Sequence, residues 1–217
     1  MKSIASRDNP TFKALRLLAK DGREQQRRRE AVLDGVHLVS EYRARVGLPR
    51  LLVVSESGER HAEVQAVLAA HEGVELLRLR DPLFGEVSGM PSPVGILAVI
   101  AIPDAPAASP PGSCVLLEGI QDAGNVGTIL RTAAAAGVRE AILGPGCAGA
   151  WTMRVLRAAQ GAHFGIAIRE HADLETMLKG YHGLSVATVV GGGTPLYELD
   201  LRGPVAWVFG NEGAGVS

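Results

Sequence analysis

Three polar side chains stand beside glycine-rich turns, where they could act on a bound ligand. Asn125 and Arg131 follow an apolar run that ends at Leu117, and Glu212 follows a second apolar run at 205–209. Glycines in both turns let the main chain approach a ligand closely. Ligands of open α/β sheets bind beyond the carboxyl ends of the strands, so the two turns are predicted to form walls of one site.

Common catalytic and nucleotide-binding motifs are absent from the sequence. The turn at 122–127 lacks the GxGxxG spacing of dinucleotide folds, and the glycine run 191–193 lacks the Lys-Ser/Thr of a phosphate loop. No Ser-His-Asp or Cys-His set pairs by spacing, and Gly-x-Ser-x-Gly is missing. Cys114 and Cys147 have no metal-ligand spacing, so no metal site is predicted.

The elements that must position these residues alternate between apolar runs and amphipathic segments. In the first hundred residues they indicate a small α/β/α layered domain. Its strands are predicted at 31–33, 50–55, 75–79 and 93–102, and its helices at 37–46, at 61–71, from Asn9 and from Asp81.

The rest of the chain repeats strand-helix units with short connections. Strands are predicted at 114–117, 140–143, 165–168, 185–190 and 205–209, and helices at 124–136, 152–160 and 173–179. This pattern predicts a parallel sheet with helices on both faces.

Four prolines within ten residues, 103–112, mark a break between these two parts. Pro-rich linkers are semi-rigid spacers. The predicted organisation is therefore a domain at 1–102, a linker at 103–112 and a second domain at 113–217.

Charge is distributed unevenly although the net charge is only -1. Residues 1–50 carry 12 Lys and Arg against 6 Asp and Glu. The densest cluster is Arg27, Arg28 and Arg29, and the guanidinium fork binds phosphate well. The asymmetry predicts that the N-terminal region meets a polyanion. A solvated basic helix is the alternative.

Cysteine usage and hydropathy suggest a cytoplasmic protein. Two thiols in 217 residues fit a reducing compartment. The first residues lack the apolar core of a signal peptide, and no apolar run reaches the roughly 20 residues that span a bilayer. Cys114 lies inside a predicted strand with no base nearby, so we interpret it as a core residue.

The motifs resemble those of a known family of enzymes. EGIQDAGNVGTILRTAAAAG is similar to the first motif of the SpoU (TrmH-type) RNA 2′-O-ribose methyltransferases, and VFGNEGAGVS to their second. LRAAQGAHF resembles the segment that connects the motifs, and SRDNPTFKALRLLAK, RRRE and DGVHLV resemble the ribosomal-protein-like substrate-binding domain of the family. The resemblance covers nearly the whole chain.

This resemblance implies a fold, a cofactor and a set of site residues. The second domain would be a trefoil-knot α/β fold that binds S-adenosylmethionine and forms a homodimer, and the substrate would be rRNA or tRNA. Asn125, Arg131 and Glu212 would be catalytic. The residues expected to bind the cofactor are Val190, Gly191, Gly210, Asn211 and Gly213, and those expected to bind RNA are Lys13, Arg27, Arg28 and Arg29.

Each catalytic candidate also has an ordinary structural interpretation. Arg131 would orient the ribose or phosphate and stabilise developing oxyanion charge, because a guanidinium hardly deprotonates; otherwise it forms a surface salt bridge. Asn125 would bond the turn or the ribose, or act as a helix N-cap. Glu212 would pair with Arg131, within one chain or across a dimer, or cap a helix start.

The third motif of the family, a Ser-Leu-Asn-rich segment followed by a helix, is not found before Ser217. We therefore expect the knot segment to be missing from these residues, and cofactor binding and turnover to suffer if nothing follows. Two other functions stay open: an inactive RNA-binding or ribosome-assembly protein of the same fold, and a small-molecule enzyme with a Rossmann-like sheet.

Overall fold

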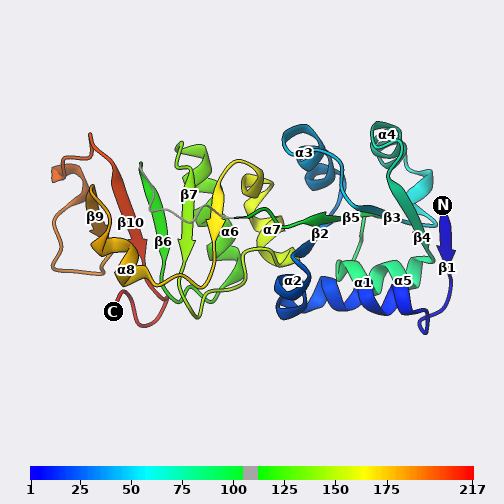
Figure 1. Ribbon diagram of the computed structural model, residues 1–217, viewed down its shortest axis with the longest axis horizontal. Helices are drawn as coiled ribbons and strands as arrows, with labels where there is room; N and C mark the ends of the chain where they lie inside the picture. The colour runs from blue at the N-terminus through cyan, green and yellow to red at the C-terminus, as the bar shows by residue number, and fades with distance from the viewer. Residues whose placement is uncertain (105–111) are drawn as a thin grey trace.

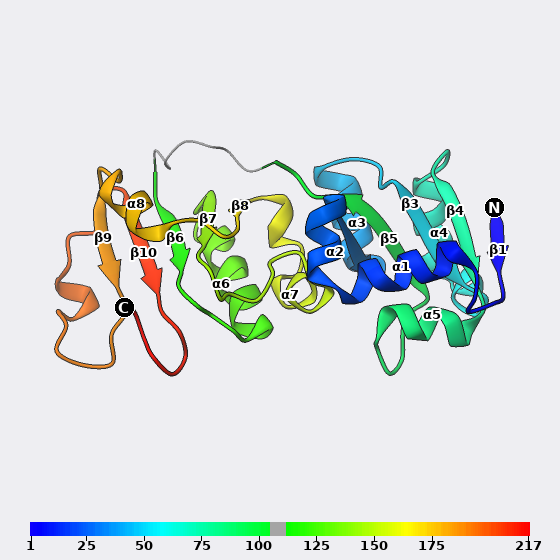
Figure 2. The same ribbon diagram turned by 60° about the horizontal axis from the view of Figure 1, so that its bottom comes forward.

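The computed structural model describes residues 1–104 and 112–217, and two five-stranded sheets lie side by side in an elongated molecule (Figures 1 and 2). We refer to these ranges as the N-terminal half and the C-terminal half. The predicted linker at 103–112 falls mostly outside the described residues. Both halves mix helices and strands, so the α/β class is confirmed.

The N-terminal half is a sheet with helices on both faces, in the order β1-β4-β3-β5-β2. β5 is antiparallel to β3 and β2, and the other pairs are parallel. Helices α1 and α5 share one buried cluster with the sheet, while α3 and α4 belong to another. The strands are β1 Lys2–Ile4, β2 Glu30–Asp34, β3 Leu51–Ser55, β4 Glu75–Leu79 and β5 Ile96–Ala101. The helices are α1 Pro10–Lys20, α2 Gly22–Arg28, α3 Val36–Arg45, α4 Ala62–Ala70 and α5 Asp81–Ser88.

Helix α1 shows how local sequence sets an element of this half. The Asn9 side chain accepts hydrogen bonds from the main-chain N–H groups of Thr11 and Phe12, and Pro10 occupies the first helical position. The apolar residues that follow at helical spacing are buried against the sheet, and they are Phe12, Leu15 and Leu18.

The C-terminal half is an all-parallel sheet in the order β8-β7-β6-β10-β9, which confirms the predicted parallel sheet. Alternate residues of its strands face opposite layers. Cys114 and Leu116 pack with α8, whereas Val115 and Leu117 pack with α6 and α7. The strands are β6 Cys114–Leu117, β7 Glu140–Leu143, β8 Ala167–Arg169, β9 Leu184–Ala187 and β10 Val205–Phe209. The helices are α6 Ala123–Ala135, α7 Met153–Ala159 and α8 Leu174–Lys179.

The direction of strand order reverses between β6 and β10. From β6 the chain adds β7 and then β8 on one side, whereas β10 and β9 lie on the other. A crevice beyond the carboxyl ends of the strands at such a switch point is the usual ligand site of an open parallel sheet. The two glycine-rich turns leave the sheet at this point.

The two halves pack directly on each other. A Pro-rich spacer between two domains did not predict this contact. Helix α7 contacts β2, and one buried cluster contains residues from both halves. The rings of Tyr42 and Phe164 meet edge to face with centroids 5.3 Å apart. The Arg157 guanidinium donates to Asp34 Oδ2 at 3.3 Å. The position of the N-terminal half is therefore set by buried contacts.

Candidate functional site

The two glycine-rich turns, residues 118–122 and 210–215, lie against each other; we call them the turn pair. β6 and β10 are neighbours, so the turns begin on adjacent strands. The Asn211 side chain donates to the Gly119 carbonyl at 2.7 Å, and the Glu118 main-chain N–H donates to the Phe209 carbonyl at 2.9 Å. The structure thus brings together two stretches that lie about ninety residues apart.

Glu212 holds the turn pair to the start of α6. Its carboxylate accepts hydrogen bonds from the main-chain N–H groups of Gln121 and Asp122, both at 3.2 Å, and from Asn125 Nδ2 at 3.0 Å. The Asn125 hydrogen bond, followed by those from main-chain N–H groups, lowers the pKa of Glu212 to about 2. Glu212 is therefore an anion at neutral pH and a poor proton acceptor.

Helix α6 is capped by Asp122 and not by Asn125, which corrects one alternative for Asn125. The helix begins at Ala123, and Asp122 Oδ1 accepts the main-chain N–H of Asn125 at 2.9 Å. Asn125 lies inside the first turn, where its side chain is free to donate to Glu212. Glu212 does not cap α6 itself, since its carboxylate bonds the main-chain N–H groups of Gln121 and Asp122, just before the first helical residue.

Glycine is required at two positions of the turn pair by the backbone itself. A Cβ at Gly210 would fall on the main chain of Gly215, because Asn211 and Gly215 form a bridge that closes the turn. Gly119 has φ +64°, in the left-handed region that favours glycine. Gly213 is less constrained, and its main-chain N–H donates to Asn211 Oδ1 at 2.9 Å.

A third turn, after β7, completes the wall beside the turn pair, and it was not predicted. The Cys147 thiol donates to the Leu117 carbonyl at 3.2 Å, and the Ala148 N–H donates to the Ile120 carbonyl at 2.8 Å. Burial raises the pKa of Cys147, so its thiol stays protonated. The Gly144-Pro145-Gly146 turn was visible in the sequence, but nothing there indicated which strand it would lie beside.

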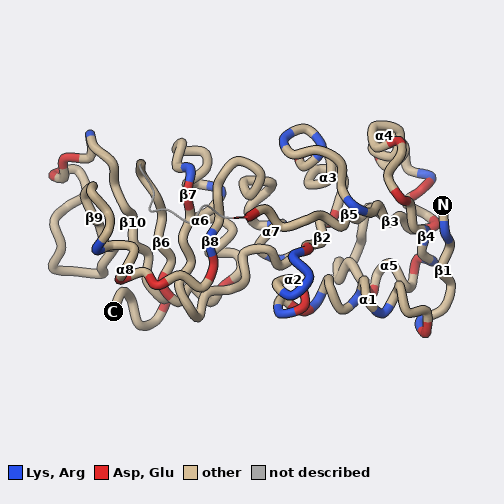
Figure 3. Tube along the Cα trace, in the orientation of Figure 1, with Lys and Arg blue, Asp and Glu red and all other residues tan. Residues whose placement is uncertain are grey.

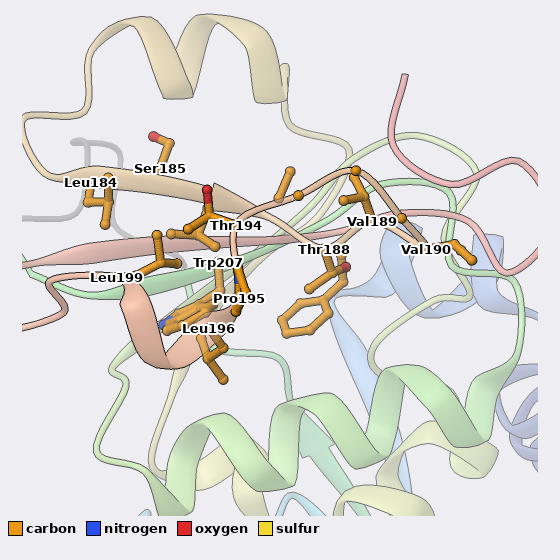
Figure 4. A pocket seen from close by; sticks show the side chains of 16 residues that line it. Leu184, Ser185, Thr188, Val189, Val190, Thr194, Pro195, Leu196, Leu199 and Trp207 are labelled. Carbon is orange, nitrogen blue, oxygen red and sulfur yellow. The ribbon is translucent and has the colours of Figure 1, made fainter.

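Val190 and Gly191 lie apart from the turn pair, in a loop beyond the end of β9. Strand β9 ends at Ala187, so the expectation of a strand to Val190 is wrong, and Val190 is fully exposed. The loop lines an open hollow of about 710 Å³ that is also walled by Trp207 and Phe209 of β10 (Figure 4). Phe209 belongs both to this hollow and, through its carbonyl, to the turn pair. Val190 and Gly191 therefore line a hollow that adjoins the turn pair, which holds the other expected cofactor residues.

Arg131 is not brought to the turn pair within one chain. It lies about 9 Å along the α6 axis from Asn125, and it lines a separate hollow with Glu41 and Arg45 of α3 and with Arg139. Within residues 1–104 and 112–217, Arg131 forms no ion pair, so the surface salt bridge that was its alternative is not seen.

The four residues expected to bind RNA are all paired with carboxylates, although they lie on the part of α1 and α2 where basic residues gather (Figure 3). These pairs are Lys13–Asp8, Arg27–Glu24, Arg28–Glu30 and Arg29–Asp104, with distances from 2.6 to 2.9 Å. The Lys13–Asp8 and Arg29–Asp104 pairs are exposed and therefore weak, whereas Arg28 bonds the largely buried Glu30. A phosphate would still have to displace a carboxylate from each cation.

Two structural findings concern the other expectations. Cys114 is 1% exposed and burial raises its pKa to about 11, so it is a core thiol. In the part of the chain that the structure describes, no helix is long and apolar enough to cross a bilayer.

Comparison with known proteins agrees with this architecture. Residues 112–217 match the model of the SpoU rRNA Methylase family. The chain is 30% identical to the 23S rRNA (guanosine(2553)-2′-O)-methyltransferase RlmP of Bacillus subtilis, over 100% of this chain and 85% of that protein. It is 31% identical to a tRNA/rRNA methyltransferase of Synechocystis, over 99% of this chain and 80% of that protein.

Solved structures give the same result for the fold. The AdoMet-bound rRNA methyltransferase from Sinorhizobium meliloti superposes with a TM-score of 0.82 at 25% identity, covering 100% of this chain and 83% of that one. The superposition and the matches to both relatives extend over both halves of the chain. The chain belongs to the SpoU rRNA methylase family.

Proposed function

We propose that this protein transfers the methyl group of S-adenosylmethionine to a ribose 2′-hydroxyl of structured RNA, in rRNA or tRNA. The observation that carries the proposal is the junction of the two family motifs through Glu212 at the switch point of the parallel sheet. The named relatives are RNA methyltransferases, which supports this activity over the inactive alternative.

The residues around the turn pair suit a cationic, partly apolar cofactor. When bound, S-adenosylmethionine supplies an electrophilic methyl group on a sulfonium. We propose that Gly210, Asn211 and Gly213 form part of the wall against which it binds, and that Val190 and Gly191 contact it from the hollow that Trp207 also lines. The anionic Glu212 favours a positive charge nearby.

Bound S-adenosylmethionine would supply the methyl carbon to the ribose oxygen and leave as the neutral thioether S-adenosylhomocysteine, with the hydroxyl proton released to water. Glu212 is not the acceptor of that proton, because its pKa is about 2. Its role is to hold the turn pair and the Asn125 amide in place. Arg131 would remain charged, orient the ribose or phosphate and stabilise negative charge that develops on the oxygen.

We further propose that the protein is a homodimer and that Arg131 acts on the site of its partner. The support is that Arg131 lies away from Glu212 in its own chain, on a stripe of α6 exposed at Thr128, Arg131 and Thr132. Mixing Arg131→Ala with Glu212→Gln chains tests this. Shared sites would restore about a quarter of wild-type activity by random pairing, whereas sites within one chain would restore none.

The predicted domains fit the same proposal. We propose that residues 1–102 bind the RNA substrate, with contributions from Lys13 and the arginines at 27–29, and that 113–217 carry the methyltransferase site. The trefoil knot and the absence of the third motif stay predictions. A cytoplasmic location is proposed from the two free cysteines, which suit a reducing compartment.

The experiment that tests the main proposal is methyl transfer to RNA in vitro. Wild-type protein is incubated with total RNA and S-adenosylmethionine labelled in the methyl group, and the RNA is digested to nucleosides. We expect the label in a 2′-O-methylnucleoside. Label on a base would refute ribose methylation, and cofactor binding without any label would favour the inactive alternative.

A further inference from the structure

A groove between the two halves is lined by three cations, and Arg157 alone of the three is paired with a carboxylate among the described residues. We call it the interhalf groove; it has a volume of about 360 Å³, and its charged residues are Lys20 at the end of α1 and Arg154 and Arg157 of α7. No carboxylate lines it among the described residues. Lys20 and Arg154 are exposed, and neither forms an ion pair within residues 1–104 and 112–217.

Arg157, the third cation of the groove, is held in position by a buried carboxylate of the N-terminal half. Asp34 at the end of β2 accepts a hydrogen bond from Arg157 at 3.3 Å and from Ser88 at 2.9 Å. Its side chain is only 6% exposed, whereas that of Arg157 is 30% exposed. Arg157 therefore has one side fixed to the N-terminal half and another side available to the groove.

The interhalf groove continues toward the turn pair. A neighbouring groove of about 460 Å³ shares Lys20 and Thr152 with it and extends to Cys147. It carries the exposed Arg23 and also two carboxylates, Asp21 and Glu170, which accept hydrogen bonds from the main-chain N–H groups of Arg23 and Ala150. The Cys147 thiol bonds the Leu117 carbonyl, at the point where the first turn leaves β6. In Figure 1, α1, α2 and the carboxyl ends of β6, β7 and β10 all lie on one side of the molecule.

We propose that this groove binds the phosphate backbone of the RNA strand next to the methylated nucleotide, with Lys20, Arg154 and Arg157 as the phosphate contacts. Lys20 and Arg154 have no acidic partner among the described residues, so they bind phosphate without first losing an ion pair, unlike the arginines at 27–29. Arg157 keeps its bond to Asp34 and offers its exposed side. Single strands and loops reach such a groove through their phosphates. Because both halves build the groove, RNA contact there depends on their packing. The proposal rests on the RNA methyltransferase function stated above.

The test compares two double variants that change net charge equally. Lys20→Gln with Arg154→Gln removes two groove cations. Arg43→Gln with Arg60→Gln is the control, from α3 and the turn before α4, because neither residue lines the groove. Each purified protein is checked for folding by circular dichroism. Its affinity for a methylatable RNA is measured from roughly 50 to 300 mM salt, a range over which phosphate contacts change the affinity strongly.

We expect the groove variant to bind RNA about tenfold more weakly. The plot of log affinity against log salt concentration should become less steep, with a slope smaller in magnitude by roughly 1.5. The control should keep both values, S-adenosylmethionine affinity should be equal in all proteins, and Arg154→Lys should retain most of the RNA affinity. Equal losses of RNA affinity in the groove and control variants, or no loss in either, would refute RNA binding in the groove. The groove would then be a candidate site for another polyanion, such as an acidic protein segment. Methyl transfer by the wild type, measured in parallel, judges the proposed function separately.

Discussion

Gly127 offers a direct test of how motif one is built, because a single methyl group there has no space. Gly127 lies on the face of α6 that packs against α7, the most extensive helix contact in the molecule. A Cβ added at Gly127 would lie 2.8 Å from the Val155 carbonyl oxygen and 2.9 Å from the Ala159 nitrogen, and nearer still to the Ala158 Cβ. Two of these three neighbours are main-chain atoms, so the helices themselves must move apart.

The expected cost follows from two opposing effects. Overpacking that moves backbone costs up to about 3 kcal/mol, and replacing a helical glycine by alanine recovers about 1 kcal/mol. Gly127→Ala should therefore lower the free energy of unfolding by about 2 kcal/mol. For a chain of this size, that corresponds to a Tm lower by roughly 4–8 °C.

Gly85 in α5 is a matched control, since a Cβ there meets no atom within 4 Å. Gly85→Ala should gain about 1 kcal/mol and raise the Tm by roughly 2–4 °C. Calorimetry on both variants measures the difference. If Gly127→Ala were as stable as Gly85→Ala, the close approach of α6 and α7 would be wrong, and the glycine would have to be explained by ligand contact.

Three further predictions concern the polar residues of the site. Glu212 has a pKa of about 2 in the folded protein, below its unfolded value, so its contribution to stability is complete above about pH 4.5 and is lost as the pH falls toward 2. Glu212→Gln should therefore reduce the loss of unfolding free energy between about pH 4.5 and 2. The same loss in the variant and the wild type would contradict the carboxylate contacts. Asn125→Ala should raise the pKa of Glu212, measured by NMR titration of its carboxyl carbon, because Asn125 contributes most to the lowering; a pKa still near 2 would rule this out. Arg131→Lys keeps the charge but loses the fork, and should lose most turnover while cofactor affinity is retained; near-normal turnover would exclude the proposed role.

Much of the fold was predictable because its signals are local. Apolar runs bounded by Gly, Pro and Asp placed nine of the ten strands found in residues 1–104 and 112–217, and Asn9-Pro10 placed the start of α1. β1 was missed because Lys2–Ile4 is three residues long, has no apolar run and is a strand only through its pairing with β4. The contact between the two motif turns was predictable as well, because the carboxyl ends of parallel strands lie at the same edge of a sheet.

Long-range packing was not predictable from these signals. Gly127 reads as a turn or ligand glycine in the sequence, yet its partners are on α7, some thirty residues later. Asp34 and Arg157 come from different halves, and no periodicity links them. A pairing of Arg131 with Glu212 within one chain is not seen, because Arg131 lies beside α3, and the pairing across a dimer stays a prediction. The interhalf groove depends on the packing of α7 against the N-terminal half, to which the contact between Asp34 and Arg157 belongs.

The most direct measurement of the central claim is a map of 2′-O-methylation over all rRNA and tRNA positions in a deletion strain, complemented with the wild-type protein or with Glu212→Gln. We expect methylation to disappear at a defined ribose, to return with the wild-type protein, and to return poorly with Glu212→Gln. An unchanged map in the deletion strain, or full restoration by Glu212→Gln, would contradict the placement of the site at the turn pair.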